Sequence, residues 1–152
     1  MRLALYHNLP SGGAKRTLTE ATKRLAVNHH VDVYSLTTAN HDFADLRHYV
    51  AGHRLFDFRA WRLLPSPFGR LNQVSRLADL LRLRAMSRAI ARTIEQGNYD
   101  VVLAHPCQLA KSPTILEFLE QTPSVYYCQE PLRILYEAMP PRPYDDNAIS
   151  RR

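Results

Sequence analysis

The sequence predicts an α/β protein with a parallel sheet of four to five strands, and three observations predict this fold class. A strand-like run at residues 2–7, a helical pattern from Ala14 and a period-two run at residues 31–37 follow one another in the order of a βαβ unit. The uninterrupted apolar run at residues 101–104 is typical of a strand buried on both faces of a parallel sheet. A second run of this kind is expected at residues 125–128.

The first half of the chain supplies three of these strands and one helix. Residues 2–7 are expected to form a strand that stops at the turn-forming residues 8–13. Ala14, Leu18, Ala21 and Leu25 then recur at helical spacing and mark one apolar stripe. Residues 31–37 predict the second strand and residues 54–58 a further short one.

A long helix is expected at residues 70–96, ended by Gly97 and Asn98, but its apolar residues mark two faces. The first face comprises Leu71, Val74, Ala78 and Leu81, and the second comprises Leu83, Met86, Ile90 and Ile94. At about 100° per residue these faces point in nearly opposite directions. The pattern therefore predicts a break or sharp bend at residues 80–84.

The last part of the chain is expected to hold two buried strands and a tail. The strand at residues 101–104 ends at His105 and Pro106, and a short helix is expected at residues 113–121 before the strand at 125–128. One or two helical turns follow at residues 132–138. Residues 139–152 are polar and rich in proline. We therefore expect one domain at residues 1–138 and a tail at 139–152.

Composition excludes several classes of protein. The 152 residues are 45% hydrophobic and 22% charged, a globular rather than a disordered balance. No apolar run approaches the roughly 18 residues that a membrane-spanning helix needs, and the amino terminus does not read as a signal peptide. Cys107 and Cys128 are too few for a disulfide scaffold, so two reduced, packed thiols in a cytoplasmic protein are expected.

The chain carries 20 basic and 14 acidic residues, a net charge of +6, which suits nucleic acid, anionic lipid or a phosphorylated small molecule. Arg84, Arg88 and Arg92 recur at every fourth position, which is most simply a solvated helix face. Because the aromatic segment around Trp61 precedes them, these residues are also candidates for a peripheral membrane surface. Nucleic-acid binding is a third interpretation, and no signature of an RNA-binding or helix-turn-helix motif accompanies it.

Three candidate positions fall at the carboxyl ends of predicted strands, where ligands of such sheets collect. The turn with Gly12 and Gly13 presents helix N–H groups that suit a phosphate or diphosphate, although a tight turn is the alternative. His105 can hydrogen-bond a sugar hydroxyl or move a proton, or else cap the next helix. Gln129 and Glu130 follow the next strand, and the Glu130 carboxylate can bind hydroxyls or cap a turn.

A metal site is not expected. The histidines outside the strand ends show no spacing typical of metal ligands and are interpreted as surface residues, while His7 is expected to be structural. The surface group comprises His29, His30, His41, His48 and His53. No HExxH motif and no serine nucleophile elbow is present.

Three segments in this order resemble the amino-terminal domain of GT-B glycosyltransferases of the family 4 type. Residues 1–25 are similar to the opening strand, Gly-Gly turn and amphipathic helix of that family, and residues 99–106 to its strand that ends in a histidine. Residues 125–131 are similar to the following strand, where histidine commonly stands at the position of Gln129. The resemblance covers about residues 1 to 137.

The resemblance implies a Rossmann-like domain with helices on both faces of its sheet, belonging to an enzyme that transfers a sugar from a nucleotide-diphosphate sugar, with retention and without a metal cofactor. It places Gly12 and Gly13 against the donor diphosphate and His105 against the donor sugar near the reaction centre. Gln129, Glu130 and Lys15 are candidate contacts of the acceptor or sugar. A glycan or lipid-linked acceptor at the inner face of the membrane would give the arginine stripe a role.

Departures from the family limit what the chain is expected to do. Lys15 stands where an acidic residue is common, and the family's second domain, which holds the nucleotide, is not in this chain. We therefore expect an incomplete GT-B amino-terminal domain, the acceptor-side half of a glycosyltransferase, inactive without a separately encoded carboxyl-terminal half. The alternative is a non-catalytic Rossmann-like module that binds an anionic metabolite or membrane lipid.

Overall fold

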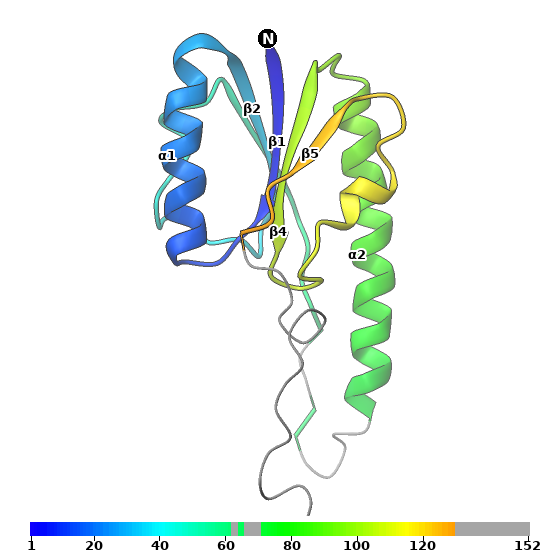
Figure 1. Ribbon diagram of the computed structural model, residues 1–152. Helices are drawn as coiled ribbons and strands as arrows, with labels where there is room; N and C mark the ends of the chain where they lie inside the picture. Colours follow the sequence, from blue (N-terminus) through cyan, green and yellow to red (C-terminus); the bar gives the residue numbers. More distant parts are fainter. Residues whose placement is uncertain (62–63, 66–70, 130–152) are drawn as a thin grey trace, which may run out of the picture.

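The computed structural model describes residues 1–61, 64–65 and 71–129, which form a three-layer α/β domain (Figure 1). Its elements in chain order are β1 (Arg2–Asn8), α1 (Gly13–Asn28), β2 (His30–Leu36), β3 (Gly52–Phe56), α2 (Asn72–Glu95), β4 (Val101–Cys107), the 3₁₀ helix η2 (Thr114–Glu117) and β5 (Ser124–Tyr126). The expectations for Glu130, for helical turns at residues 132–138 and for the tail at 139–152 lie outside the described residues.

The five strands form one all-parallel sheet in the order β3-β2-β1-β4-β5, which confirms the predicted α/β class and strand number. The order reverses direction between β1 and β4, because β2 and β3 extend to one side of β1 while β4 and β5 extend to the other. This is the Rossmann-like arrangement, and ligands of such sheets bind at the carboxyl edge near the reversal. That edge is the lower one in Figure 1.

Helices cover both faces of the sheet, as expected. Alternate residues of β1 point to opposite faces: Leu3 and Leu5 pack with Leu18 of α1, whereas Ala4 and Tyr6 pack with Ile90 of α2. Figure 1 shows α1 on one side of the sheet, with α2 and η2 on the other. The carboxyl edge of β1 continues this alternation, so that His7 faces α1.

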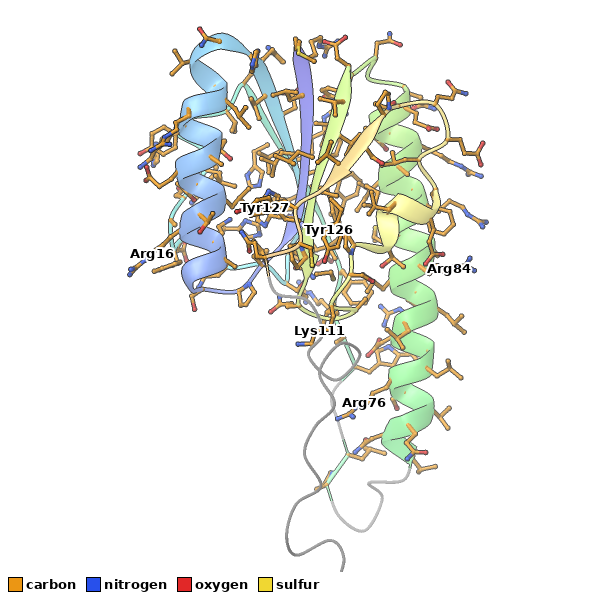
Figure 2. All side chains as sticks on the ribbon, viewed as in Figure 1. Arg16, Arg76, Arg84, Lys111, Tyr126 and Tyr127 are labelled. Atoms are coloured by element: carbon orange, nitrogen blue, oxygen red, sulfur yellow. The ribbon has the colours of Figure 1, made fainter. Side chains whose placement is uncertain are left out.

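The helix α2 runs without interruption from Asn72 to Glu95, so the predicted break at residues 80–84 is wrong. The face with Leu83, Ile90 and Ile94 is buried against the sheet. The amino-terminal half projects past the carboxyl edge of the sheet, so the sheet does not cover its apolar side chains (Figures 1 and 2). The helix therefore continues uninterrupted, and the large apolar residues of its first face are exposed to solvent.

The carboxyl-terminal strand also differs from expectation. β5 is an edge strand of three residues with Val125 54% exposed, so the run at residues 125–128 is not a strand buried on both faces. Cys128 is accordingly exposed, whereas Cys107 at the end of β4 is buried as expected, and both are free thiols. The helix expected at residues 113–121 is reduced to the single 3₁₀ turn of η2.

Candidate functional site

Three of the positions expected at the carboxyl edge meet there in the structure. The amide Nε2 of Gln129, which follows β5, donates a hydrogen bond to the Ala14 carbonyl oxygen in the first turn of α1, with a distance of 3.1 Å. The ring of His105 in β4 lies 5.4 Å from the ring of Tyr127, centroid to centroid. The chain after β5 thus links the start of α1 to the end of β4, while Glu130 lies outside the described residues.

The first turn of α1 is open to a ligand. Gly12 precedes the helix with φ 146° and ψ −173°, a conformation open essentially to glycine alone. No side chain of the described residues caps the helix, and no acidic residue stands in its first turn. The free N–H groups and the positive end of the helix dipole at such a turn attract anions. A turn of this kind suits a phosphate or diphosphate, and the binding role expected for Gly12 and Gly13 stays a prediction.

His105 is buried at the end of β4 with an exposed fraction of 2%. Neither ring nitrogen has a hydrogen-bond partner among the described residues. Burial, with a smaller contribution from the Lys15 ammonium, lowers the pKa of His105 from its usual 6.5 to about 4. At neutral pH the imidazole is therefore uncharged, with one donor and one acceptor nitrogen available to a ligand.

Lys15 is buried against His7, a burial that the sequence did not indicate. Only 1% of Lys15 is exposed, and its Nζ lies 3.2 Å from Nε2 of His7, which is itself fully buried. Burial lowers the pKa of Lys15 to about 8 and that of His7 well below its usual value. The expectation that His7 is structural stays a prediction, but its contact with Lys15 places it within the site.

Two histidines interpreted as surface residues are partly buried in the same region. His41 lies 6.4 Å from His7 and 5.4 Å from His53, measured between ring centroids. His53 contacts the Ser35 hydroxyl through Nε2 at 2.8 Å. β3 brings His53 to the sheet through its pairing with Val33, and this long-range register cannot be read from the spacing of histidines in the sequence.

A polar pocket of about 510 Å³ lies at the carboxyl edge, between the loops that follow β1, β2 and β4. Its polar side chains belong to Ser11, Thr37, Thr38, Asn40, His41, Asp42 and Gln108. Asn8 holds these loops together, because its Oδ1 accepts a hydrogen bond from the Thr38 hydroxyl at 2.9 Å and its Nδ2 donates to Cys107 Sγ at 3.3 Å. Hydroxyl and amide groups of this kind suit a ligand rich in hydroxyls.

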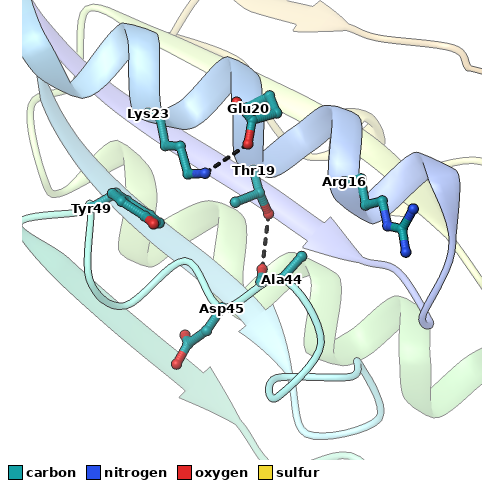
Figure 3. Close-up of a pocket in the computed structure, with 7 residues that line it drawn as sticks. All are labelled: Arg16, Thr19, Glu20, Lys23, Ala44, Asp45 and Tyr49. Atoms are coloured by element: carbon teal, nitrogen blue, oxygen red, sulfur yellow. Dashed lines mark hydrogen bonds and ion pairs between the residues drawn. The ribbon is translucent and has the colours of Figure 1, made fainter.

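A second, smaller pocket of about 260 Å³ lies on the outer side of α1, against the loop at residues 44–49 (Figure 3). Its charged side chains largely contact one another. Lys23 donates to Glu20 at 2.7 Å and lies over the Tyr49 ring, and Asp45 binds Arg47 outside the pocket at 2.8 Å. These pairings leave little charge free for a ligand.

The arginine stripe of α2 is partly engaged within the protein. Arg84 forms an ion pair with Glu117 at 2.8 Å, and both Arg84 and Arg88 lie over the ring of Phe118. Arg92 is exposed in the last turn of α2. Trp61 is exposed beside the projecting half of this helix, where its backbone N–H donates to the Asp79 carboxylate. The structure therefore shows only part of the stripe free to meet a surface.

Among the described residues no cluster of three or more histidine, cysteine or carboxylate side chains is arranged to hold a metal ion. In the same part of the chain, no helix combines the length and apolar character needed to cross a bilayer.

The strand order and the helices on both faces of the sheet define a Rossmann-like α/β protein. Beyond this class, no protein-family model matches the chain and no curated protein matches it. Among solved structures the chain is similar to the carboxyl-terminal domain of a hydrogenase from Pyrococcus furiosus, with a TM-score of 0.47 and 16% sequence identity, over 82% of this chain and 88% of that chain. A likeness at this level carries no argument about function.

Proposed function

We propose that this chain is the acceptor-side half of a retaining glycosyltransferase of GT-B architecture, which transfers a sugar from a nucleotide-diphosphate sugar to an acceptor. The observation that carries the proposal is the convergence of the open α1 terminus and the unpaired imidazole of His105 at one edge of the sheet, linked through Gln129. The resemblance in sequence places a donor diphosphate and a donor sugar at these same two positions.

Each group has a role that its environment supports. The N–H groups at Gly12 and Gly13 would hold the diphosphate oxygens, as helix termini do in other nucleotide-binding folds. A neutral His105 would hydrogen-bond a hydroxyl of the donor sugar, and the polar pocket beside Asn8 would take hydroxyls of the acceptor. The negative charge of the diphosphate is met by helix N–H groups, so the proposed mechanism includes no metal ion.

The test is sugar transfer by the purified chain, alone and after addition of a separately encoded donor-binding half recovered with the tagged chain. We expect little or no transfer by the chain alone, because the base and ribose of the donor lack their second domain. In the completed enzyme, His105→Ala should lower kcat by at least about 100-fold, as loss of a preorganised hydrogen bond does. The exposed His48 provides the control His48→Ala.

Two outcomes would contradict this proposal. Robust transfer by the chain alone would show that it is not a half enzyme. Unchanged transfer by His105→Ala in the completed enzyme would remove the role given to the histidine.

A second candidate function is binding to an anionic membrane lipid, favoured by the projecting half of α2. Val74, Leu77 and Leu81 are 67%, 60% and 60% exposed and lie on one side of the helix. By helical spacing Arg84, Arg88 and Arg92 continue that same side, and Arg76 lies on the projecting half (Figure 2). Apolar and basic residues together on one helix suit the boundary of an anionic bilayer. Such binding would place the protein at the inner face of the membrane.

Co-sedimentation with vesicles tests whether the protein binds an anionic membrane lipid. The chain should bind vesicles that contain phosphatidylglycerol, less so as salt rises, and not those of phosphatidylcholine alone. The double variant Leu77→Glu, Leu81→Glu should lose this binding, whereas Val27→Glu on the exposed end of α1 should keep it. Equal binding by both variants would exclude α2 as the contact.

A further inference from the structure

Lys15 is a buried cation without a carboxylate partner among the described residues. It is the third residue of the helical span of α1, and its side chain points to the sheet, where 1% of the residue is exposed. None of the ion pairs of the described residues includes Lys15, and its Nζ contacts Nε2 of His7 instead. A buried ammonium normally has a carboxylate or several carbonyl oxygens beside it, because its desolvation is costly.

The surroundings of Lys15 are basic rather than acidic. His7, His41, His53 and His105 gather on the α1 side of the sheet, and the charge of Lys15 lowers the pKa of three of them. Asp45 is the carboxylate whose charge acts on Lys15, but that side chain forms an ion pair with Arg47 and not with Lys15. The described part of this cluster thus holds a positive charge without a matching negative one.

The hydrogen-bonding roles of His7 depend on the charge of Lys15. A charged Lys15 can only donate, so Nε2 of His7 must offer its lone pair and Nδ1 must carry the proton. The Leu9 N–H also points at Nδ1, at 3.4 Å, and would need a lone pair there. One neutral imidazole cannot satisfy both contacts while Lys15 is charged. An uncharged Lys15 amine would accept from Nε2–H and leave the Nδ1 lone pair to the Leu9 N–H, so an anion that holds Lys15 charged would favour the Nδ1–H tautomer at the expense of the Leu9 contact.

The cluster is joined to the start of α1 through Lys15. Lys15 lies in the first turn of this helix, two residues after Gly13, and Gln129 is hydrogen-bonded to Ala14 in the same turn. His105 is 2% exposed, both of its ring nitrogens are unpaired among the described residues, and the charge of Lys15 acts on it. Three kinds of group that bind phosphoryl oxygens, namely helix N–H, ammonium and imidazole, therefore share one site.

We infer that Lys15 is the counter-charge of a phosphoryl dianion bound at the α1 terminus, with His7 and His105 as its hydrogen-bonding neighbours. The inference deepens the proposed function and rests on its placement of the diphosphate. It adds a residue to that site at a position where the resembling family commonly has an acidic side chain. The ligand chemistry is a phosphate or diphosphate group, either free or part of a nucleoside diphosphate.

The inference predicts opposite effects of one substitution on stability and on binding. Lys15→Met keeps the length of the side chain and removes the buried charge, so the free variant should unfold at the same temperature as the wild type or higher. Its affinity for inorganic pyrophosphate should fall roughly 10- to 100-fold, the loss expected for one charged hydrogen bond. Lys23→Met, on the exposed side of the same helix, should leave this affinity unchanged.

The measurement is thermal unfolding of the three proteins in phosphate-free buffer at about pH 7.5, with inorganic pyrophosphate or a nucleoside diphosphate added, since a ligand of the folded state raises Tm. Both ligands should raise the Tm of the wild type and of Lys23→Met, and Lys15→Met should need roughly 10- to 100-fold more of either ligand for the same rise. A larger effect of the nucleoside diphosphate would identify a nucleotide ligand, and an equal effect a free phosphate. If Lys15→Met does not fold, Lys15→Gln replaces it.

A Lys15→Met protein that melts below the wild type, and whose Tm rises with pyrophosphate as much as that of the wild type, would overturn the inference and make Lys15 a structural residue. A wild type that responds to neither ligand would overturn it as well. Pyrophosphate binding without sugar transfer in the completed enzyme would refute the proposed function alone. Sugar transfer that Lys15→Met leaves unchanged would refute the inference alone.

Discussion

The two glycines at the start of α1 should respond to alanine in opposite ways. Gly12 has φ 146° and ψ −173°, which side chains other than hydrogen rarely allow, while Gly13 has ordinary helical geometry. A Cβ built at either position meets no atom within 4 Å. The difference between Gly12→Ala and Gly13→Ala therefore isolates backbone conformation from steric contact.

Forcing alanine into the conformation of Gly12 costs about 1–3 kcal/mol. For a domain of this size that lowers Tm by roughly 2–12 °C, at about 2–4 °C per kcal/mol. Alanine at Gly13 should be neutral or stabilise by at most about 1 kcal/mol, since it restricts the unfolded chain and favours the helix.

Urea unfolding followed by circular dichroism gives both free energies, and pyrophosphate titration of Gly13→Ala then reports the closeness of the anion to the backbone. A Gly12→Ala protein as stable as the wild type would refute the requirement for glycine. A folded Gly13→Ala protein with full affinity would show that the anion does not approach that residue.

Three further perturbations test the pH dependence and the core. Because burial lowers the pKa of His105 to about 4, the folded state binds fewer protons than the unfolded state between pH 4 and 6.5, so stability is full above pH 6.5 and falls as the pH falls; His105→Gln should flatten this fall in urea midpoints, and an unchanged slope would contradict it. Ile90→Ala, in the core under α2, should lower the free energy of unfolding by about 2–5 kcal/mol, whereas Leu77→Ala should change it by less than about 0.5; equal losses in calorimetry would contradict the exposure of Leu77. Tyr99→Phe removes the hydroxyl that donates to Asp32 at 2.6 Å and should cost about 1–3 kcal/mol, measured by urea unfolding against the wild type; a loss near zero would mean that water replaces the hydroxyl.

The strands and the first helix could be predicted because local pattern and tertiary environment agree there. Leu3 and Leu5 alternate with Ala4 and Tyr6, and each set has a helix to pack against. In α2 the sequence does contain two apolar faces, but the break predicted from them at residues 80–84 is wrong. That prediction assumed that every apolar face is buried in the same domain, whereas helix length relative to the sheet decides this, and the sequence does not state where a sheet edge lies.

The edge position of β5 was missed for a related reason. An apolar run such as residues 125–128 indicates a strand, but only the strand order places Val125 at the outer edge. Cys128 follows the same logic, since its apolar neighbours suggested burial and its place beside an exposed strand prevents it. Neighbour relations across a sheet are long-range, so single-sequence patterns of a few residues do not contain them.

Only some residues of the candidate site could be predicted from the sequence. Gly12, His105 and Gln129 could be found because each ends a predicted strand or begins a helix, and parallel strands bring such positions to one edge. Lys15 was a candidate only through the resemblance to the family, and its burial could not be predicted, because a lysine on an amphipathic helix is normally solvent-exposed. A residue that contradicts its own helix pattern weakens the fold unless a ligand compensates it, and such conflicts concentrate at functional sites. The buried charge of Lys15 is therefore the strongest reason to look for an anion at this edge, independent of any likeness to a known enzyme.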